Sequence, residues 1–413
     1  MNEFRIITLD PGHFHAALVQ KEMYPGVAKR VAVYAPLGGD LAEHIHRIAR
    51  FNQRRENPTA WELDVHASSD YLERMVEDRP GNMVVLSGRN GAKIGRIRAA
   101  IDAGLNVLAD KPWIIRLSDL PELEAAIRTA EQKKLLAYDI MTERYEITSI
   151  LQRELVNTPD VFGEIEPGSI EEPAVYMESV HHILKMVAGA PNLRPVWFFD
   201  IQEQGEALAD VGTHLVDLAQ WTLFPEQAIA CGDVQVRAAS RWPTRMTAEQ
   251  FRQVTGAAGD ALDYYCNTRV SYALRGVHVK LDVLWRWEAA GGDTHFARYR
   301  GTKSDIEVRQ GEAEEYRPEL YVVPKSGNVA GALERRVGEL LGRYPGIAVE
   351  EQKGQVRVTI PDVYRVGHEA HFAQVTRQFF EYWRHPETSP SWENPNMLAK
   401  YYTCTKGVEL SHG

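Results

Sequence analysis

The sequence predicts two domains of different classes: an α/β domain built on a parallel sheet, and an α+β domain with a large, mostly antiparallel open sheet. Three observations support this prediction. The 413 residues are enough for two or more domains of ordinary size. Up to about Tyr145, short apolar runs alternate with helical patterns, as in βαβ units. Beyond it, long segments alternate apolar and polar residues, which is typical of antiparallel strands with one buried face.

The first domain is predicted over residues 1–145. In GAKIGRIRAAIDAG, apolar residues recur every three or four positions before Gly104, so this segment is predicted to be an amphipathic helix. Helices of this kind are expected on both faces of a doubly wound sheet. The predicted strands are the apolar runs FRIITL, VAVYA, MVVLSG, NVLADKP and LLAYDI.

The second domain is predicted over residues 146–413. Its clearest strand candidates are RVSYALRGVHVKLDVLWRWEA and HFARYRGTKSDIEVRQ, which alternate as the strands of a half-buried sheet do. Two stretches, 238–262 and 324–357, are polar or glycine-rich. They are predicted to be insertions, either lids or surface excursions.

Composition excludes several classes of partner. The formal charge is −10, from 47 basic and 57 acidic residues, and there is no polybasic run. We therefore expect no nucleic-acid or membrane-surface binding. The cysteines, Cys231, Cys266 and Cys404, are too far apart in sequence for a zinc knuckle or a disulfide framework. Without a signal peptide or an apolar run of roughly 20 residues, a cytoplasmic protein is expected.

The first strand ends in LDPGHFHAAL, where a dinucleotide-binding fold places its glycine fingerprint. Only Gly12 is in register, and Asp10 and His15 occupy the places of the outer glycines. An ordinary strand-to-helix turn is the alternative. If a dinucleotide binds here, Gly12, His13, Phe14 and His15 are its predicted contacts.

The second strand offers no clear choice between NAD and NADP. An Asp or Glu at its end would bind the hydroxyls of the adenosine ribose. The strand instead ends in Tyr34, Ala35 and Pro36, and Asp40 is the nearest acid. NAD is predicted as the cofactor, with NADP left open.

The strand NVLADKP delivers Asp110 and Lys111 to the carboxyl edge of the sheet, where ligands bind in such folds. A lysine there can neutralise or hydrogen-bond a reacting oxygen, and a solvated loop lysine is the alternative. In the loop SGRNGAK, Ser87 and Asn90 complete the predicted cofactor contacts together with Asp110 and Lys111.

The strongest local feature is the amphipathic helix GEALADVGTHLVDLAQWTLFP. At 100° per residue, Asp210, His214, Asp217 and Trp221 fall on one stripe beside the apolar stripe. An Asp four residues before a His can orient the imidazole and raise its basicity, which suits a base that removes a hydroxyl proton. A purely structural pair is the alternative.

Other histidines do not predict a metal site. They include the pairs His13/His15, His181/His182 and His368/His371, none of which matches a ligand set such as HExxH. The adjacent His181 and His182 follow a strand pattern that sends them to opposite faces. One of the two is expected to face the substrate, and no metal is expected.

Taken in order, the nucleotide-binding half, the ADKP segment and the DVGTHLVD helix resemble the Gfo/Idh/MocA family, named for glucose-fructose oxidoreductase and inositol dehydrogenase. Asp110, Lys111 and Pro112 match its Glu-Lys-Pro with one exchange. Its Asp-x-Gly-x-His-x-x-Asp helix is matched in full. The resemblance covers nearly the whole chain. The altered glycine loop is a departure, and so is Lys93, which replaces a histidine frequent in the family.

The resemblance implies a Rossmann domain joined to an open-sheet domain, and a homo-oligomer, either a dimer or a tetramer. It implies that Lys111, Asp210 and His214 surround the substrate and that Arg144 lies in the segment linking the two domains. We add Arg144, His181 and His182 as candidate substrate contacts. A C-terminal helix at about 368–384 is expected to return to the first domain.

The predicted function is therefore an NAD(P)-dependent oxidoreductase acting on a secondary carbinol of a sugar, glycoside or polyol. His214, oriented by Asp210, is expected to take the hydroxyl proton while Lys111 stabilises the alkoxide. Two alternatives stay open at this stage. One is a glycoside hydrolase or epimerase that uses tightly bound NAD for transient oxidation. The other is a non-catalytic dinucleotide or sugar sensor.

Overall fold

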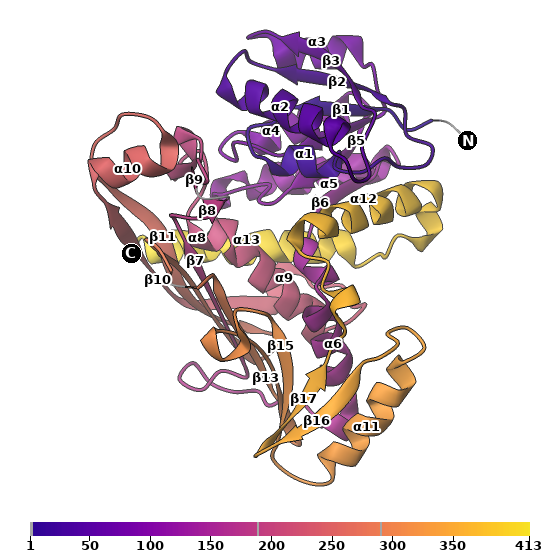
Figure 1. The fold of residues 1–413 in the computed structure, drawn as a ribbon, viewed down its shortest axis with the longest axis vertical. Helices are drawn as coiled ribbons and strands as arrows, with labels where there is room; N and C mark the ends of the chain where they lie inside the picture. The colour runs from indigo at the N-terminus through magenta and orange to yellow at the C-terminus, as the bar shows by residue number, and fades with distance from the viewer. Residues whose placement is uncertain (1–2, 188–189, 290) are drawn as a thin grey trace. The chain divides into compact units, whose positions relative to one another are not determined.

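The computed structural model describes residues 3–187, 190–289 and 291–413, and they divide into two compact units (Figure 1). Each unit is assembled from separate segments of the chain, whereas the sequence predicts one boundary at residue 145, with a C-terminal helix at about 368–384 returning to the first domain. Unit 1 contains Met1–Thr142, Pro195–Gly205 and His368–Tyr401. Unit 2 contains Glu143–Arg194, Glu206–Gly367 and Tyr402–Gly413.

Unit 1 is built on a parallel sheet with the order β3-β2-β1-β4-β5-β6. This is the order of a Rossmann fold, so the predicted fold class is confirmed. The central strand β1 is buried along its whole length, as expected for a parallel sheet covered on both faces. The strands are β1 (Ile6–Leu9), β2 (Arg30–Ala35), β3 (Glu62–Ala67), β4 (Met83–Leu86), β5 (Asn106–Asp110) and β6 (Ala137–Ile140).

The edge strand β3 was missing from the sequence analysis. Its sequence, ELDVHA, gives every second position to a polar residue, and all six of its residues are half-buried or exposed. An edge strand buries little surface, so it carries no continuous apolar run that a pattern could reveal.

Helices from both ends of the chain complete unit 1. The first group is α1 (His15–Val19), α2 (Gly39–Gln53), α3 (Tyr71–Asp78), α4 (Lys93–Asp102) and α5 (Leu120–Gln132). The second is α12 (His368–Arg384) and the part of α13 (Glu393–Ser411) that ends at Tyr401. Met397 and Tyr401 of α13 belong to the same apolar cluster as the strands and α4. Lys400 Nζ and Tyr401 Oη donate hydrogen bonds to Asp139 Oδ2 at 2.8 and 2.7 Å. The C-terminal helices are therefore part of the first unit's core.

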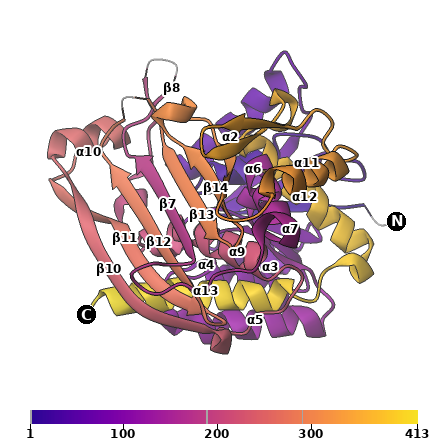
Figure 2. The ribbon, with the colours of Figure 1, turned by 90° about the horizontal axis from the view of Figure 1, so that it is seen from below.

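Unit 2 contains the large sheet, in the order β10-β11-β12-β7-β13-β14-β15-β17-β16 (Figure 2). All neighbouring pairs are antiparallel except β12 with β7, which confirms the prediction of a mostly antiparallel sheet. Its strands are β7 (Val175–His182), β10 (Val234–Met246), β11 (Leu262–Leu274), β12 (Val277–Arg286), β13 (Thr294–Arg300), β14 (Ser304–Gln310), β15 (Glu319–Pro324), β16 (Ala348–Gln352) and β17 (Gln355–Thr359).

The helices of unit 2 are α6 (Ile147–Val156), α7 (Pro159–Phe162), α8 (Ala207–Asp210), α9 (Gly212–Leu223), α10 (Ala248–Thr255) and α11 (Val329–Leu340). The two polar stretches predicted as insertions are regular structure. Residues 238–262 hold most of β10 and all of α10, and residues 324–357 hold α11, β16 and part of β17. They extend both edges of the sheet, where polar residues are tolerated on exposed faces.

Among the helices of the described residues, none combines the length and the apolar character needed to cross a bilayer.

One buried histidine of unit 1 should make stability depend on pH. His44 of α2 is 3% exposed, and neither ring nitrogen has a hydrogen-bond partner among the described residues. Burial, helped by Arg47, lowers the pKa of His44 from 6.5 to about 4. Between these two pH values the unfolded chain binds a proton that the folded chain excludes, so the folded state loses stability as the pH falls.

We therefore expect the thermal unfolding midpoint to drop as the pH is lowered from neutral to about 5, and His44→Leu to flatten this dependence. At full development the effect of one such histidine is about 3 kcal/mol. His46→Leu, at an exposed position of the same helix, is the control. An equal pH dependence in the His44 and His46 variants would contradict the assignment.

Candidate functional site

The loop after β1 pairs its acidic residue with an arginine of α4. Asp10 has a left-handed backbone (φ 46°), which aspartate tolerates better than most residues. Its carboxylate forms an ion pair with Arg96 of α4 at 2.9 Å, and both side chains are largely buried. The negative charge that stands in place of the first fingerprint glycine is thereby neutralised.

Two glycines let the loops after β1 and β4 approach each other. The His13 N–H donates to the carbonyl of Ser87 at 3.1 Å. A Cβ on Gly88 would lie 2.5 Å from the carbonyl oxygen of Asp10 and 2.8 Å from the nitrogen of Gly12. A Cβ on Gly12 would meet Asp40 Oδ2, Gly88 Cα and Trp197 Cζ2, each at 3.3 Å. A side chain at position 12 would crowd all three atoms, so only glycine leaves the backbone of this turn bare, as the close approach of a diphosphate requires; the turn at Gly12 is here named the cradle.

Gly88→Ala is expected to destabilise the protein, because the new methyl group would overlap backbone atoms that have nowhere to move. Overpacking of this kind costs about 1–3 kcal/mol. Gly95→Ala is the matched control, since no atom lies within 4 Å of a Cβ built there and the residue sits inside α4. That change should stabilise by about 0.5–1 kcal/mol. Thermal unfolding checks both, and equal shifts in one direction would contradict the close contact.

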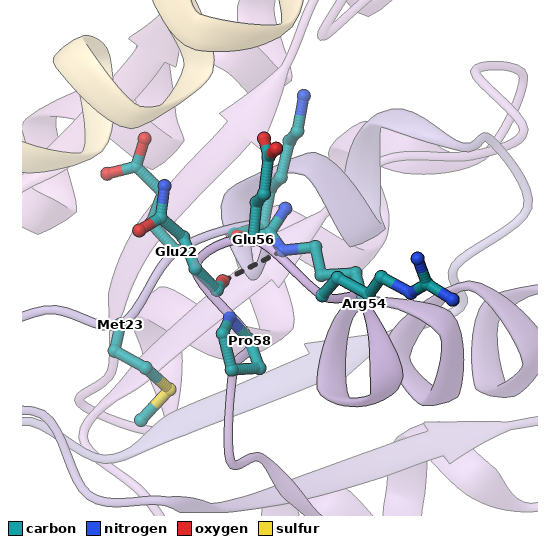
Figure 3. Close-up of a pocket in the computed structure, with 8 residues that line it drawn as sticks. Glu22, Met23, Arg54, Glu56 and Pro58 are labelled. Atoms are coloured by element: carbon teal, nitrogen blue, oxygen red, sulfur yellow. Dashed lines mark hydrogen bonds between the residues drawn. The ribbon is translucent and has the colours of Figure 1, made fainter.

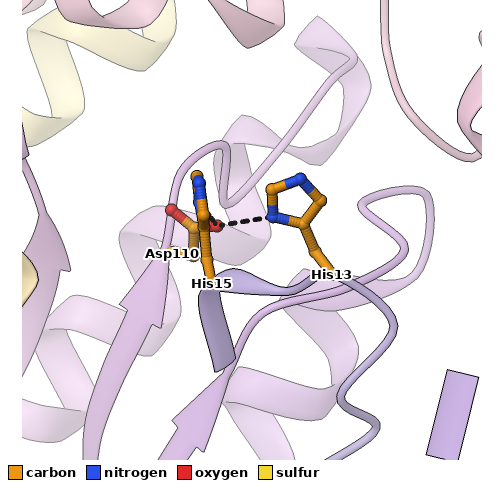
Figure 4. Close-up of side chains that lie close together, drawn as sticks. All are labelled: His13, His15 and Asp110. Carbon is orange, nitrogen blue, oxygen red and sulfur yellow. Dashed lines mark hydrogen bonds and ion pairs between the residues drawn. The ribbon is translucent and has the colours of Figure 1, made fainter. Parts of the chain in front are cut away.

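His13, His15 and Asp110 form an imidazole cluster at the carboxyl edge of the sheet (Figure 4). Asp110 Oδ2 accepts from His15 Nδ1 at 2.9 Å and from Ser87 Oγ at 2.8 Å, and lies 3.8 Å from His13 Nδ1. Lys93 Nζ donates to the main-chain carbonyl of Asp110 at 2.9 Å. Thus Asp110 is held from several sides.

The charges of this cluster are well defined. Burial alone would raise the pKa of Asp110, but His15, Lys93 and Lys111 outweigh it and hold that pKa well below its usual range. Burial lowers the pKa of His15 in spite of Asp110. Asp110 is therefore ionised and His15 neutral at neutral pH, so His15 Nδ1 carries the proton that it donates to the carboxylate.

The same three side chains could in principle hold a metal ion, since their ligand atoms lie within 4.8 Å of one another. Two imidazoles and one carboxylate suit a transition metal. However, the positive charges of Lys93 and Lys111 act on this cluster, and Asp110 Oδ2 already accepts two hydrogen bonds. We assign it as a hydrogen-bonded network, and the absence of a metal stays a prediction.

Pro195–Gly205, here named the strap, belongs to unit 1 although it comes from the middle of the chain. The main-chain N–H and the side-chain Nδ2 of Asn90 donate to the carbonyls of Glu203 and Gln204, both at 2.7 Å. Asn90 Oδ1 is buried and accepts no hydrogen bond from any described residue, so it is available to a ligand. In this way the strap anchors the loop after β4.

The strap also brings Trp197 to Asp40 at the start of α2. The indole Nε1 donates to Asp40 Oδ2 at 3.0 Å, and Arg89 Nη2 lies 3.5 Å from the same oxygen. The Arg89 guanidinium lies 5.9 Å from the centre of a Trp197 ring. Burial raises the pKa of Asp40, while Arg89 and Trp197 oppose that rise. Sequence reasoning noted Asp40 but missed Trp197, because the contact joins positions 157 residues apart.

Lys111 follows the last residue of β5 and is partly exposed. Its charge acts on both His15 and Asp110. The sequence placed it at the carboxyl edge of the sheet, and it lies there.

In unit 2, the predicted stripe lies on α8 and α9. Asp210 ends α8, is 8% exposed, and interacts electrostatically with Tyr264 and Arg194. His214 lies in the first turn of α9. Asp217 accepts two hydrogen bonds from Arg144, from Nε at 2.6 Å and from Nη2 at 2.7 Å. Arg144, predicted as a substrate contact, therefore clamps the helix that carries His214.

His181 and His182 both reach the carboxylate of Asp293, against the expectation that they face opposite ways. His181 Nδ1 lies 3.3 Å from Oδ2, and His182 Nδ1 lies 3.0 Å from Oδ1. They are the last residues of β7, and Asp293 precedes β13, the neighbouring strand, so both rings turn to it at the strand end. Lys185 Nζ donates a hydrogen bond to Asp293 Oδ2 at 2.5 Å.

This group of four residues has a fixed charge at its centre. Burial would raise the pKa of Asp293, but hydrogen bonding from His181 and the charge of Lys185 lower it. A carboxylate surrounded by donors is suited to binding hydroxyl groups. Asp293 gave no signal in the sequence, because it stands in a glycine-rich turn outside every motif.

A surface hollow of about 860 Å³ lies elsewhere on unit 1 (Figure 3). Arg54 Nη2 donates to the carbonyl of Lys21 at 2.6 Å across it. Its walls precede β2 and β3, so it opens at the amino edge of the sheet, opposite the ligand edge. We assign no dinucleotide to it. Its lining residues are Lys21, Glu22, Met23, Arg54, Arg55, Glu56, Asn57 and Pro58.

Comparisons with known proteins agree with the fold. Residues 151–412 match the family described as "Putative oxidoreductase C terminal domain". A "putative oxidoreductase" from Parabacteroides merdae is 46% identical, with a TM-score of 0.97 over 100% of this chain and 98% of the other. No curated protein matches significantly.

More distant solved structures share the fold. GenD2 from gentamicin A biosynthesis, in complex with NAD, is 17% identical, with a TM-score of 0.62 over 100% of this chain and 95% of the other. KijD10, a 3-ketoreductase from Actinomadura kijaniata in complex with NADP and TDP-benzene, is 15% identical, with a TM-score of 0.59 over 97% and 95%.

Proposed function

Since this chain belongs to the Gfo/Idh/MocA family of oxidoreductases, we propose that it transfers a hydride between NAD(P) and a secondary carbinol of a sugar, glycoside or polyol. The observation that carries the proposal is the cradle at Gly12, which a side chain would crowd. The NAD and NADP complexes of the distant neighbours support a nicotinamide cofactor.

The residues of unit 1 fit a dinucleotide. Gly12 leaves the backbone of the turn without a side chain, the pairing of Asp10 with Arg96 neutralises one negative charge, and Asn90 Oδ1 offers an acceptor. When bound, the nicotinamide accepts or returns the hydride. The imidazole cluster joins the segment after β1 and the loop after β4 to Asp110 at the end of β5. It therefore positions Lys111, the next residue, relative to the cradle.

Three side chains accept the proton of the substrate and stabilise the charges that develop in the reaction. In the oxidation direction, His214 takes the proton of the substrate hydroxyl, and Asp210 stabilises the imidazolium that results. Lys111 stabilises the negative charge on the carbinol oxygen. The bidentate contact of Arg144 with Asp217 keeps the helix of His214 in place. In the reduction direction the same groups act in reverse.

The donor-rich group around Asp293 supports a polyhydroxylated substrate. Sugars present hydroxyls that donate to carboxylates and accept from imidazole and ammonium groups. His181 also stacks on Trp285 with ring centres 4.9 Å apart. We propose His181, His182 and Asp293 as substrate contacts. A homo-oligomer, dimer or tetramer, is part of the same proposal and is checked by analytical ultracentrifugation.

The decisive experiment records absorbance of reduced nicotinamide while the purified protein is offered sugars, glycosides and polyols with NAD or NADP. Accumulation of reduced cofactor with one polyol class would support net dehydrogenation. Cofactor that copurifies and cycles without accumulating would favour transient oxidation by a hydrolase or epimerase. Failure to bind any dinucleotide in calorimetry would refute the proposal.

A further inference from the structure

Ser179 of unit 2 lies beside the group around Asp293. It stands on β7 two residues before His181, so the two side chains share one face of the sheet. Ser179 Oγ lies 2.8 Å from His181 Nε2, and His181 Nδ1 lies 3.3 Å from Asp293 Oδ2. The serine, the imidazole and the carboxylate therefore form one hydrogen-bonded chain.

This chain has a direction. Burial would raise the pKa of Asp293, but hydrogen bonding from His181 and the charge of Lys185 lower it, so the carboxylate is ionised. An ionised carboxylate can only accept, and the proton of the neutral imidazole is therefore on Nδ1. Nε2 is then an acceptor, and the Ser179 hydroxyl donates to it. Toward any further partner, Ser179 Oγ has only lone pairs to offer.

The carboxylate end of the chain is held in place by the turn between β14 and β15. Gln310 Nε2 donates to the main-chain carbonyl of Asp293 at 3.2 Å. A Cβ on Gly291 would lie 1.9 Å from Tyr316 Cε2, so the Tyr316 ring packs on bare backbone two residues before Asp293. Tyr316 itself has a left-handed backbone (φ 58°), and strain of this kind is concentrated at functional sites.

We propose that Ser179 accepts a hydrogen bond from a substrate hydroxyl other than the one oxidised, and thereby selects substrates that carry a free donor at that position. This inference rests on the proposed function, and it adds a specificity-determining residue to it. Ser179 is only 8% exposed, so its oxygen is largely removed from water. A substrate without the donor would leave this buried acceptor unpaired, and such a loss is costly.

The order serine, histidine, carboxylate is also that of serine hydrolases, in which the serine attacks an acyl carbon. In those enzymes the main-chain N–H of the serine helps to bind the oxyanion. Here β7 lies inside the sheet, and Ser179 is paired with Val283 of β12 on one side and with His295 of β13 on the other. Its main-chain groups belong to the sheet, so the geometry favours binding over nucleophilic attack.

The test is steady-state kinetics at pH 8, where an ordinary imidazole is neutral. The probes are the sugar or polyol that reduces the cofactor fastest in the absorbance assay and its analogues in which each hydroxyl in turn is replaced by fluorine, which cannot donate. At one position away from the oxidised carbon, we expect the wild-type protein to lose about 100-fold in kcat/KM.

The variants assign this loss to the serine. In Ser179→Ala the same fluorine should cost only about tenfold, because the acceptor is gone while the inductive effect of fluorine remains. Ser179→Thr keeps the hydroxyl and should discriminate like the wild type. Ser240→Ala, at an exposed position of β10 in the same sheet, is the matched control and should also keep the full discrimination.

The outcomes separate the two proposals. Wild-type protein that tolerates fluorine at every position away from the oxidised carbon overturns the role of Ser179 and leaves the oxidoreductase proposal standing, and this comparison needs no variant to fold. An undiminished loss in Ser179→Ala also overturns it, since another group then binds the hydroxyl. A fluorophosphonate probe should leave Ser179 unlabelled, and a labelled Ser179 peptide in mass spectrometry would make the serine a nucleophile instead. Wild-type protein that reduces neither NAD nor NADP with any sugar, glycoside or polyol overturns the proposed function itself and this inference with it.

Discussion

Replacing Lys111 by alanine is expected to lower kcat by about a thousandfold, because the ammonium group that stabilises the alkoxide is lost at the step where charge develops. Binding of NAD should change little, since the cradle at Gly12 does not depend on this side chain. Folding should also be preserved, because Asp110 keeps its hydrogen bonds from His15 and Ser87.

Steady-state kinetics with the substrate identified in the sugar and polyol assay measure this effect. Lys111→Met, which keeps most of the volume, should be as slow as the alanine variant. Lys134→Ala, at an exposed position of the same unit, should be as fast as the wild type. A Lys111→Ala protein with wild-type kcat and KM would remove the lysine from the mechanism.

The second large effect is expected at His214. His214→Ala should reduce kcat in the oxidation direction by about a thousandfold, since the general base is gone. The fall of activity toward low pH, which protonation of the base causes in the wild type, should disappear from the residual activity. Asp210→Asn should be milder, because the imidazole remains and loses only its electrostatic support.

His385→Ala, at an exposed histidine just after the end of α12, serves as the control and should leave both the rate and the pH profile unchanged. The profile separates chemistry from structure: a helix that merely packs badly would lower the rate at every pH alike. If His214→Ala retains the acid limb of the wild-type profile, the base is another group.

More of the fold than of the candidate site could be predicted from the sequence. Fully buried strands such as β1 and β5 are apolar runs that a pattern can reveal, whereas β3 and β16 lie at sheet edges and have only half-buried or exposed side chains. The pattern alone therefore located the central strands and the edge strand β6, and missed the edge strands β3 and β16. The stretches 238–262 and 324–357 were taken for insertions for the same reason.

Site residues that stand in a short motif could be predicted from the sequence, and those outside any motif could not. Lys111 and His214 stand in short motifs whose place in the fold can be deduced from the end of a strand or the face of a helix. The contacts of Asp40 with Trp197, and of His182 with Asp293, join residues more than a hundred positions apart. No local periodicity can report such pairs, and only the folded chain brings them together.

The segmental assembly of unit 1 has a consequence for its synthesis. Its sheet is complete by residue 142, yet part of its core comes from Met397 and Tyr401, and the charge of Asp139 meets Lys400 there. During translation, this sheet emerges from the ribosome before α13 has been made. It then exposes an unfinished apolar surface while more than two hundred further residues are translated. We expect chaperones to engage that intermediate, and a chain that terminates before α13 to be degraded rather than to persist as a free nucleotide-binding domain.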